Sequence, residues 1–227
     1  MLRNRFLPIL VGLTALAMVI SLYLVFVYAP TERTMGDVQR IFYFHVPSAW
    51  VGFLAFLVAF VAGIAYLTRR QWRWDTVETA SIELGVVFST VALVTGSLWA
   101  RPTWNTWWTW DPRLTTTLVL WIYYVSVLLL RQMVENEERR ARFSAVLSIV
   151  GFVNVPIVFL TIRLWRTIHP VLFTSEGFGL EPSMLLALLV SLLTFTLLYL
   201  CLLWLRVGQE YLHAEIGRMK ERLLSAS

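Results

Sequence analysis

The chain has 227 residues, of which 58% are hydrophobic and only 15% are charged, and its mean hydropathy is +0.69. This is far more apolar than one soluble core requires, so the composition indicates a polytopic membrane protein. A formal net charge of +5 would suggest a nucleic-acid partner in a soluble protein, but here the basic residues cluster at helix ends, where membrane orientation explains them better. The single cysteine, Cys201, excludes an intrachain disulfide and a CxxC thiol pair.

Six apolar stretches are each long enough to cross a hydrocarbon core of roughly 30 Å as a helix. The predicted helices cover about residues 7–29, 46–67, 79–99, 114–132, 143–162 and 183–205. The first follows Arg3 and Arg5 as a signal peptide would, but its apolar run is too long for an h-region and no clear cleavage site follows it. We therefore predict an all-α protein in which residues 1–227 form a single domain with six transmembrane helices.

Charge asymmetry predicts the orientation of these helices. Six spans place both termini on one side, together with the connections near residues 69–78 and 131–142, and this side carries thirteen Lys and Arg residues. The loops near residues 30–45, 100–113 and 163–182 carry six. Because positive charge is retained on the inner side, both termini are predicted to be cytoplasmic and the three loops to face the periplasm.

The loop between the third and fourth predicted helices is rich in tryptophan. It reads WARPTWNTWWTWDPRLT from residue 99 to 115, and Pro102 and Pro112 disfavour continuation of the two helices across it. An interfacial aromatic belt is one interpretation. However, five indoles within twelve residues, together with Asp111, favour a broad apolar platform for a large planar ligand. The five are Trp99, Trp104, Trp107, Trp108 and Trp110.

Two histidines are predicted on the same side as the tryptophans. His45 lies in FYFHVPSAW, where the first outer loop enters the second helix, and His169 lies in RTIHP in the last outer loop. Either alone would be more typical of a hydrogen-bonding residue. As a pair beside the platform they favour axial ligation of haem b iron, since two imidazoles can bind iron from opposite faces. Because ligation needs neutral imidazole, with a usual pKa of about 6.5, acidification is expected to weaken haem retention.

Other polar residues have less specific interpretations. Arg101, Arg113 and Arg166 could pair with the haem propionates or serve as interfacial anchors. Glu83, within the third span, is expected to have a structural partner or to reach towards the interface. Asn154 and Pro156 are expected to bend the fifth helix and shape the outer cavity, or only to pack. His213, near the C-terminus, is assigned no role.

The ordered motifs resemble those of the CcmC family, also called haem exporter protein C, along nearly the whole chain. WNTWWTWDPRLT resembles the family's WWD signature, with FHVPSAW before it and NVPIVF and RTIHP after it. The resemblance implies a haem held at the periplasmic surface by His45, His169 and the WWD loop. One departure is LWRTIHP, where a WWNTLHQ-like run is expected, so Arg166 replaces a neutral residue and Pro170 follows the histidine.

The resemblance also implies partners. It implies delivery of haem to the chaperone CcmE and assembly with CcmA, CcmB and CcmD in an ATP-binding-cassette complex of the inner membrane. The chain itself has no GxxxxGK[ST] motif for ATP. The implied role is therefore haem handling and not catalysis, with assistance to covalent haem attachment on the chaperone left open.

Three alternatives differ in class. A haem b electron-transfer subunit also uses two histidines, but its ligands normally project from helices into the bundle, whereas these are predicted at loop edges. A small-substrate transporter would need several polar residues near mid-membrane, and only Glu83 and Asn154 come close. The cytochrome c synthase proteins share a WWD-type loop but have more helices and more histidines than this chain.

Overall fold

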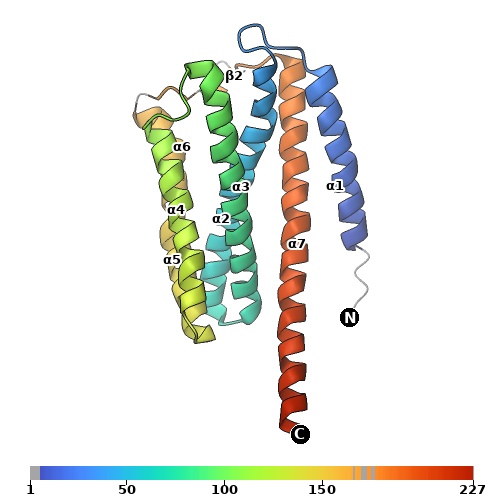
Figure 1. Ribbon diagram of the computed structural model, residues 1–227, viewed down its shortest axis with the longest axis vertical. Helices are drawn as coiled ribbons and strands as arrows, with labels where there is room; N and C mark the ends of the chain where they lie inside the picture. Colours follow the sequence, from blue (N-terminus) through green and yellow to red (C-terminus); the bar gives the residue numbers. More distant parts are fainter. Residues whose placement is uncertain (1–5, 166, 170–172, 175–176, 227) are drawn as a thin grey trace.

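A computed structural model describes residues 6–165, 167–169, 173–174 and 177–226. Within this part of the chain six helical segments are long and apolar enough to cross a membrane, which confirms the predicted number of spans. They lie side by side along the long axis of the molecule (Figure 1). The segments are Phe6–Tyr28, Asp37–Arg69, Trp72–Trp104, Pro112–Met133, Glu137–Leu164 and Pro182–His213.

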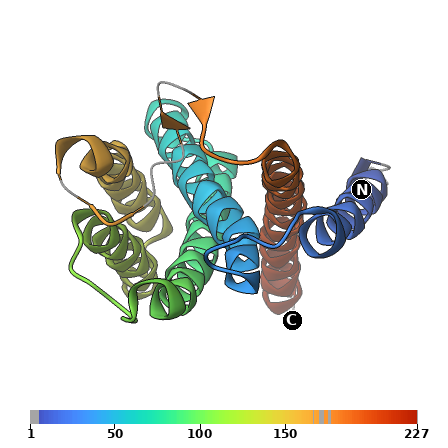
Figure 2. The same cartoon turned by 90° about the horizontal axis from the view of Figure 1, so that it is seen from above.

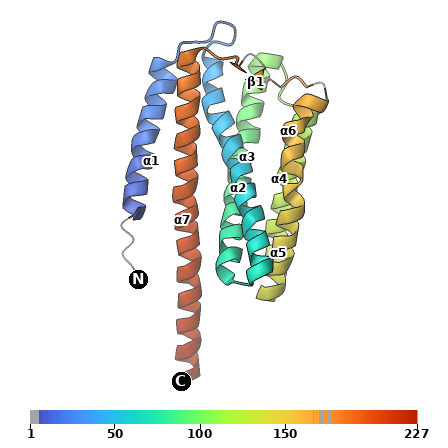
Figure 3. The ribbon, with the colours of Figure 1, turned by 180° about the vertical axis from the view of Figure 1, so that it is seen from behind.

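The elements differ in detail from this list of spans, because some spans contain two helices. In chain order they are α1 (Phe6–Tyr23), the π-helical turn η1 (Leu24–Tyr28), the 3-10 turn η2 (Asp37–Ile41), α2 (Phe42–Arg69), α3 (Trp72–Trp104), α4 (Pro112–Met133), α5 (Glu137–Phe152), α6 (Asn154–Leu164), β1 (Phe173–Thr174), β2 (Gly177–Phe178) and α7 (Pro182–Ala226). The two short strands pair antiparallel. They lie at the same end of the bundle as the loop between α3 and α4 (Figures 1 and 3).

Helices at this end begin earlier or end later than predicted. The turn η2 leads directly into α2, so His45 lies in the first turn of a helix and not at a loop edge. The third helix extends beyond its predicted end near residue 99 and through Pro102, since α3 continues to Trp104, but as expected it is not continuous with α4 across the loop. The Thr103 hydroxyl donates a hydrogen bond to the Trp99 carbonyl at 2.8 Å, which adds a local contact beside the missing proline N–H. The helix ends at Asn105, whose φ is +54°.

The fifth predicted helix is divided, as Pro156 suggested. Pro156 lacks the backbone N–H that would bond to the Phe152 carbonyl. Helix α5 ends at Phe152, and α6 begins at Asn154. The Asn154 side chain donates to the Thr116 carbonyl of α4 at 3.1 Å. The helix is therefore interrupted three residues before the proline, and the asparagine connects α6 to α4.

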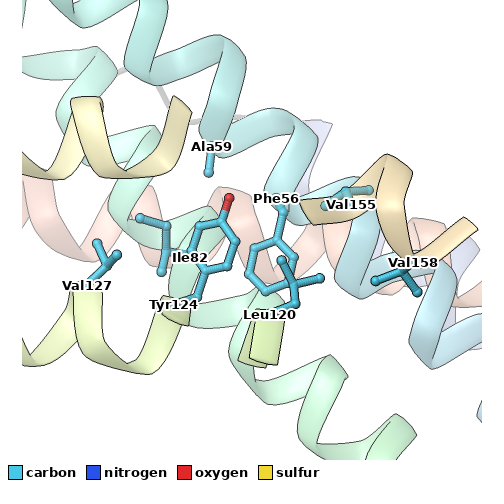
Figure 4. Close-up of a cluster of buried hydrophobic side chains, with 8 residues drawn as sticks. All are labelled: Phe56, Ala59, Ile82, Leu120, Tyr124, Val127, Val155 and Val158. Atoms are coloured by element: carbon cyan, nitrogen blue, oxygen red, sulfur yellow. The ribbon is translucent and has the colours of Figure 1, made fainter. Parts of the chain in front are cut away.

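The bundle is built around α2 and α3, with α4, α5 and α6 on one side and α7 on the other (Figure 2). Next to α7, at the edge of the bundle, lies α1 (Figures 1 and 2). In the core, Phe56 of α2 stacks on Tyr124 of α4 with ring centroids 3.8 Å apart (Figure 4). Gly85 allows this packing, because a Cβ there would lie 2.5 Å from the Phe56 ring.

Polar contacts between helices use the ionisable residues of the spans. Glu83 of α3 forms an ion pair with Arg206 of α7, with contacts of 2.6 and 3.0 Å, which confirms a structural partner for this residue. Asp75 of α3 forms a bidentate pair with Arg131 of α4 at 2.7 and 3.1 Å. Glu78 is fully buried and accepts hydrogen bonds from two serines of α5. These side chains connect neighbouring helices.

Candidate functional site

His45 is held against α3 by its ring. Its Nδ1 lies 3.0 Å from the Ala92 carbonyl oxygen and 3.2 Å from the Thr95 hydroxyl. A carbonyl can only accept a hydrogen bond, so in the neutral ring the proton is on Nδ1 and the lone pair is on Nε2. The imidazole is thereby prepared to bind a metal through Nε2.

Gly96 makes room for this ring. A Cβ at that position would lie 3.0 Å from Cε1 and 3.4 Å from Nδ1 of His45. Gly96 and Thr95 were not predicted as site residues. Their role depends on the register of α2 against α3, and the only signal in the sequence is a small residue about one turn inside the C-terminal end of the third predicted span.

The structure brings His169 to His45, although the two are far apart in the sequence. Their ring centroids are 6.2 Å apart and their planes are inclined by 47°. Bonds between imidazole nitrogen and a metal are about 2 Å long, so two imidazoles on opposite sides of one metal ion have centroids about 6 Å apart. The observed separation fits a shared metal ion.

The surroundings of His169 keep its ring neutral. Its Nδ1 is buried and has no hydrogen-bond partner among the described residues. Burial, followed by the positive charge of Arg113 and the proximity of His45, lowers the pKa of His169 to about 3, while Asp111 acts in the opposite direction. Proton competition at His169 is therefore expected only well below the usual pKa, while the effect of acid on haem retention stays a prediction.

The five tryptophans form an inner and an outer group and not one flat platform. Trp99 and Trp104 pack edge to face at 5.1 Å, and the Trp104 ring lies 6.4 Å from that of His169. Trp108 contacts Trp110 edge to face at 5.8 Å. The side chains of Trp107 and Trp110 are 57% and 75% exposed, whereas the other three are partly buried. The Nε1 atoms of Trp99 and Trp108 are buried without a partner in the described part of the chain.

Asp111 connects the tryptophan loop to the segment that carries His169. It is the N-cap of α4 and accepts a hydrogen bond from the Arg113 backbone N–H at 2.9 Å, with Pro112 at the first helical position. The Thr167 hydroxyl and the Ile168 N–H also donate to it, at 2.9 and 3.0 Å. Burial raises the pKa of Asp111, but these hydrogen bonds outweigh burial and hold it below its usual range.

The arginines differ in how many contacts their guanidinium groups make with the rest of the protein. Arg101 is exposed, donates to the Asn105 carbonyl at 2.9 Å and lies 6.0 Å from the Trp107 ring centroid. Arg113 is partly buried, and among the described residues its guanidinium has no salt bridge or hydrogen bond. Arg166 lies outside the described residues, and His213 is exposed on α7.

These features define a polytopic helical membrane protein with two neighbouring imidazoles at one end of the bundle, next to a tryptophan-rich loop. The Heme exporter protein C (CcmC) family profile matches residues 1–222. The chain therefore belongs to the CcmC family.

Individual relatives are similar over most of their length. Heme exporter protein C of Bradyrhizobium diazoefficiens is 35% identical over 96% of this chain and 84% of the relative. The protein of the same name from Escherichia coli K12 is 34% identical over 85% of this chain and 78% of the relative. A putative cytochrome c biosynthesis ccmC-like mitochondrial protein of Marchantia polymorpha is 29% identical over 84% and 82%.

Proposed function

We propose that this chain, as one transmembrane domain, binds haem b at the periplasmic membrane surface and presents it to the chaperone CcmE during cytochrome c maturation. His45 and His169 are the axial ligands of the iron. The observation that carries this proposal is the 6.2 Å separation of their rings, with the Nδ1 of His45 already bound to a backbone carbonyl. Family membership and the names of the relatives support haem as the cargo.

The surrounding side chains have two roles in this proposal. Trp104, which lies beside His169, and Trp99, which packs on it, provide apolar contact for the macrocycle close to the histidines. The partly buried Trp108 and the exposed Trp107 and Trp110 cover its outer part. Arg113 binds a propionate, because its partly buried guanidinium forms no salt bridge within the described residues. Arg101, which is exposed, contributes a second, weaker contact.

An exposed outer edge suits a protein that must release its cargo. The 57% and 75% exposure of two indoles leaves one side of the site accessible to a partner. Haem supplies the reactive vinyl group, and this chain orients it towards the chaperone without catalysing a reaction of its own. Assembly with CcmA, CcmB and CcmD in the inner membrane supplies ATP hydrolysis, since the chain has no P-loop.

One observation favours a second function. His45 projects from a helix towards α3, as ligands of haem b do in electron-transfer subunits. The sequence-based argument against that class is therefore weakened at this residue, though not at His169. A reversible redox cycle with haem retained through many turnovers would favour electron transfer, whereas loss of haem to CcmE favours presentation.

The proposal is tested by purifying the wild type and the variants His45→Ala, His169→Ala and His213→Ala, and measuring haem per chain and the visible absorption spectrum. We expect six-coordinate haem in the wild type and in His213→Ala, and altered ligation or loss of haem in the other two. Incubation with CcmE should then transfer haem from the wild type and from His213→Ala, but not from the other two variants. Identical spectra in all four proteins would contradict ligation by the pair.

A further inference from the structure

The two histidines are held in place by different means. His45 is fixed through its ring, because its Nδ1 is bound to the Ala92 carbonyl of α3. His45 lies on α2 and Ala92 on α3, and these two helices pack against each other. The ring of His169 has no such hydrogen bond within the described residues. The position of the His169 ring therefore depends on where its backbone is held.

Asp111 is connected to that backbone by a chain of hydrogen bonds. Its Oδ1 accepts from the Thr167 hydroxyl at 2.9 Å, and the same hydroxyl accepts from the His169 N–H at 3.1 Å. Its Oδ2 accepts from the Ile168 N–H at 3.0 Å. Two consecutive donors next to the ligand are thus bound to one carboxylate, which α4 fixes through the cap of Arg113 N–H.

This arrangement leaves the carboxylate little capacity for cargo. Both oxygens already accept hydrogen bonds, the residue is 9% exposed, and a carboxylate would repel the propionates of haem. A direct contact with the iron would require these bonds to break. Asp111 is therefore better suited to holding the protein's own backbone in place than to contacting haem.

We propose that Asp111 is a positioning residue for His169, and that it acts on haem ligation through residues 167 and 168 and not by contact with haem. This inference rests on the proposed haem-binding function. It implies that ligation fails first on the His169 side, since the segment of this ligand is held by two hydrogen bonds to one side chain, whereas His45 is held by helix packing.

The test uses Asp111→Asn in the full chain. Asparagine is as good an N-cap as aspartate, so α4 keeps its first turn. However, the amide nitrogen that replaces one carboxylate oxygen is a donor facing the Ile168 N–H. We expect the spectrum of His169→Ala, with His45 still bound, and haem dissociation roughly tenfold faster than in the wild type, as loss of a charge-assisted hydrogen bond implies.

Thr167 provides a second variant that leaves the cap of α4 intact. Thr167→Val removes the bridging hydroxyl and should reproduce part of the Asp111→Asn effect, while Thr167→Ser should restore wild-type ligation. Thr117→Val is the matched control, because the Thr117 hydroxyl donates only to the Arg113 carbonyl within its own helix, at 2.8 Å. Circular dichroism and thermal unfolding verify that every variant is folded.

A double mutant separates action through His169 from contact with haem. If Asp111 acts only through His169, adding Asp111→Asn to His169→Ala changes haem dissociation by less than about twofold. Additive effects, or a wild-type spectrum for Asp111→Asn when His169→Ala is altered, would overturn the inference and leave the haem function intact. Wild-type ligation in His169→Ala would instead contradict the proposed function itself.

Discussion

Gly96 is the residue whose role in the site follows most directly from packing. Its replacement by alanine places a Cβ 3.0 Å from Cε1 of His45, so the ring must shift by a few tenths of an ångström, which disturbs its bond to the Ala92 carbonyl. We expect Gly96→Ala to bind less haem per chain and to show altered ligation on the His45 side. Gly12→Ala is the control, since nothing lies within 4 Å of a Cβ there. Equal haem content in both variants would refute this packing role.

The pH dependence of ligation by His169 follows from its low pKa. The neutral, ligating form persists from pH 7 down towards about 3, whereas an imidazole with the usual pKa of about 6.5 would lose roughly thirtyfold in affinity at pH 5. The variant His45→Ala isolates this ligand. We expect its haem affinity to change less than about threefold between pH 7 and pH 5, as measured by titration with haem. A thirtyfold loss would show that His169 is not buried as described.

The low pKa of His169 preserves ligation in acid but makes the folded state less stable there. Between pH 6.5 and about 3 the unfolded chain takes up a proton at His169 that the folded chain does not, so folding stability at this residue decreases as the pH falls through that window. The low pKa of Asp111 leaves its carboxylate charged across most of the same range. The hydrogen bonds to Thr167 and Ile168 therefore persist at mildly acidic pH.

The sequence predicted the residues that would contact haem better than the residues that hold them in place. His45, His169 and the tryptophans were predicted because imidazole and indole have specific uses with haem. Whether they bind haem stays a prediction, but the structure does bring the two rings together. The supporting residues Thr95 and Gly96 could not be predicted, since their role depends on which faces of α2 and α3 meet. The contact of Asp111 with residues 167 and 168 joins two loops, which no local pattern indicates.

At the scale of elements, hydropathy located the spans but not their ends. Hydrophobic length indicates where lipid begins, whereas a helix continues as long as its backbone bonds are satisfied, so α2 and α3 extend beyond the apolar stretches. Proline acted in two different ways. Pro112 begins α4 after an aspartate cap, as expected for the first helical position, while Pro102 is accommodated within the last turns of α3.

The ion pair between Asp75 and Arg131 should be the strongest polar connection between α3 and α4. Both side chains are nearly buried, at 9% and 10% exposure, so Arg131→Met leaves an unpaired buried carboxylate and should lower the free energy of unfolding by about 3 kcal/mol. Arg142→Met breaks an exposed pair with Glu138 and should cost about 0.5 kcal/mol or less. Thermal unfolding in detergent compares the two variants. Equal decreases in unfolding temperature would contradict the larger contribution of the pair between Asp75 and Arg131.

At the scale of the whole molecule, the N-terminal end of α1 and the C-terminal end of α7 both point away from the end of the bundle that carries the tryptophan loop (Figure 3). An even number of spans requires this arrangement, so it was predictable from hydropathy alone. The order in which the helices pack was not, because it depends on contacts such as Ser21 with Ser191 between α1 and α7, at 2.9 Å, which only the fold brings together.

The direction of the bundle in the membrane is a prediction from charge. In a Cys201→Ser background, Thr34→Cys lies in the first outer loop and Glu135→Cys in the turn between α4 and α5, and both positions are exposed. An impermeant maleimide should label the first in intact spheroplasts and the second only after lysis. Cys201 itself is 4% exposed, so wild-type protein is the unlabelled control. The reverse pattern would place the tryptophan loop in the cytoplasm.

The central claim, that haem iron is bound by His45 and His169 together, is tested most directly by pulsed electron paramagnetic resonance of the ferric protein with ¹⁵N-labelled histidine. The account predicts hyperfine coupling from two histidine nitrogens in the wild type and from one in each of His45→Gly and His169→Gly. Coupling from two histidines that survives either substitution, or no histidine coupling in the wild type, would contradict it.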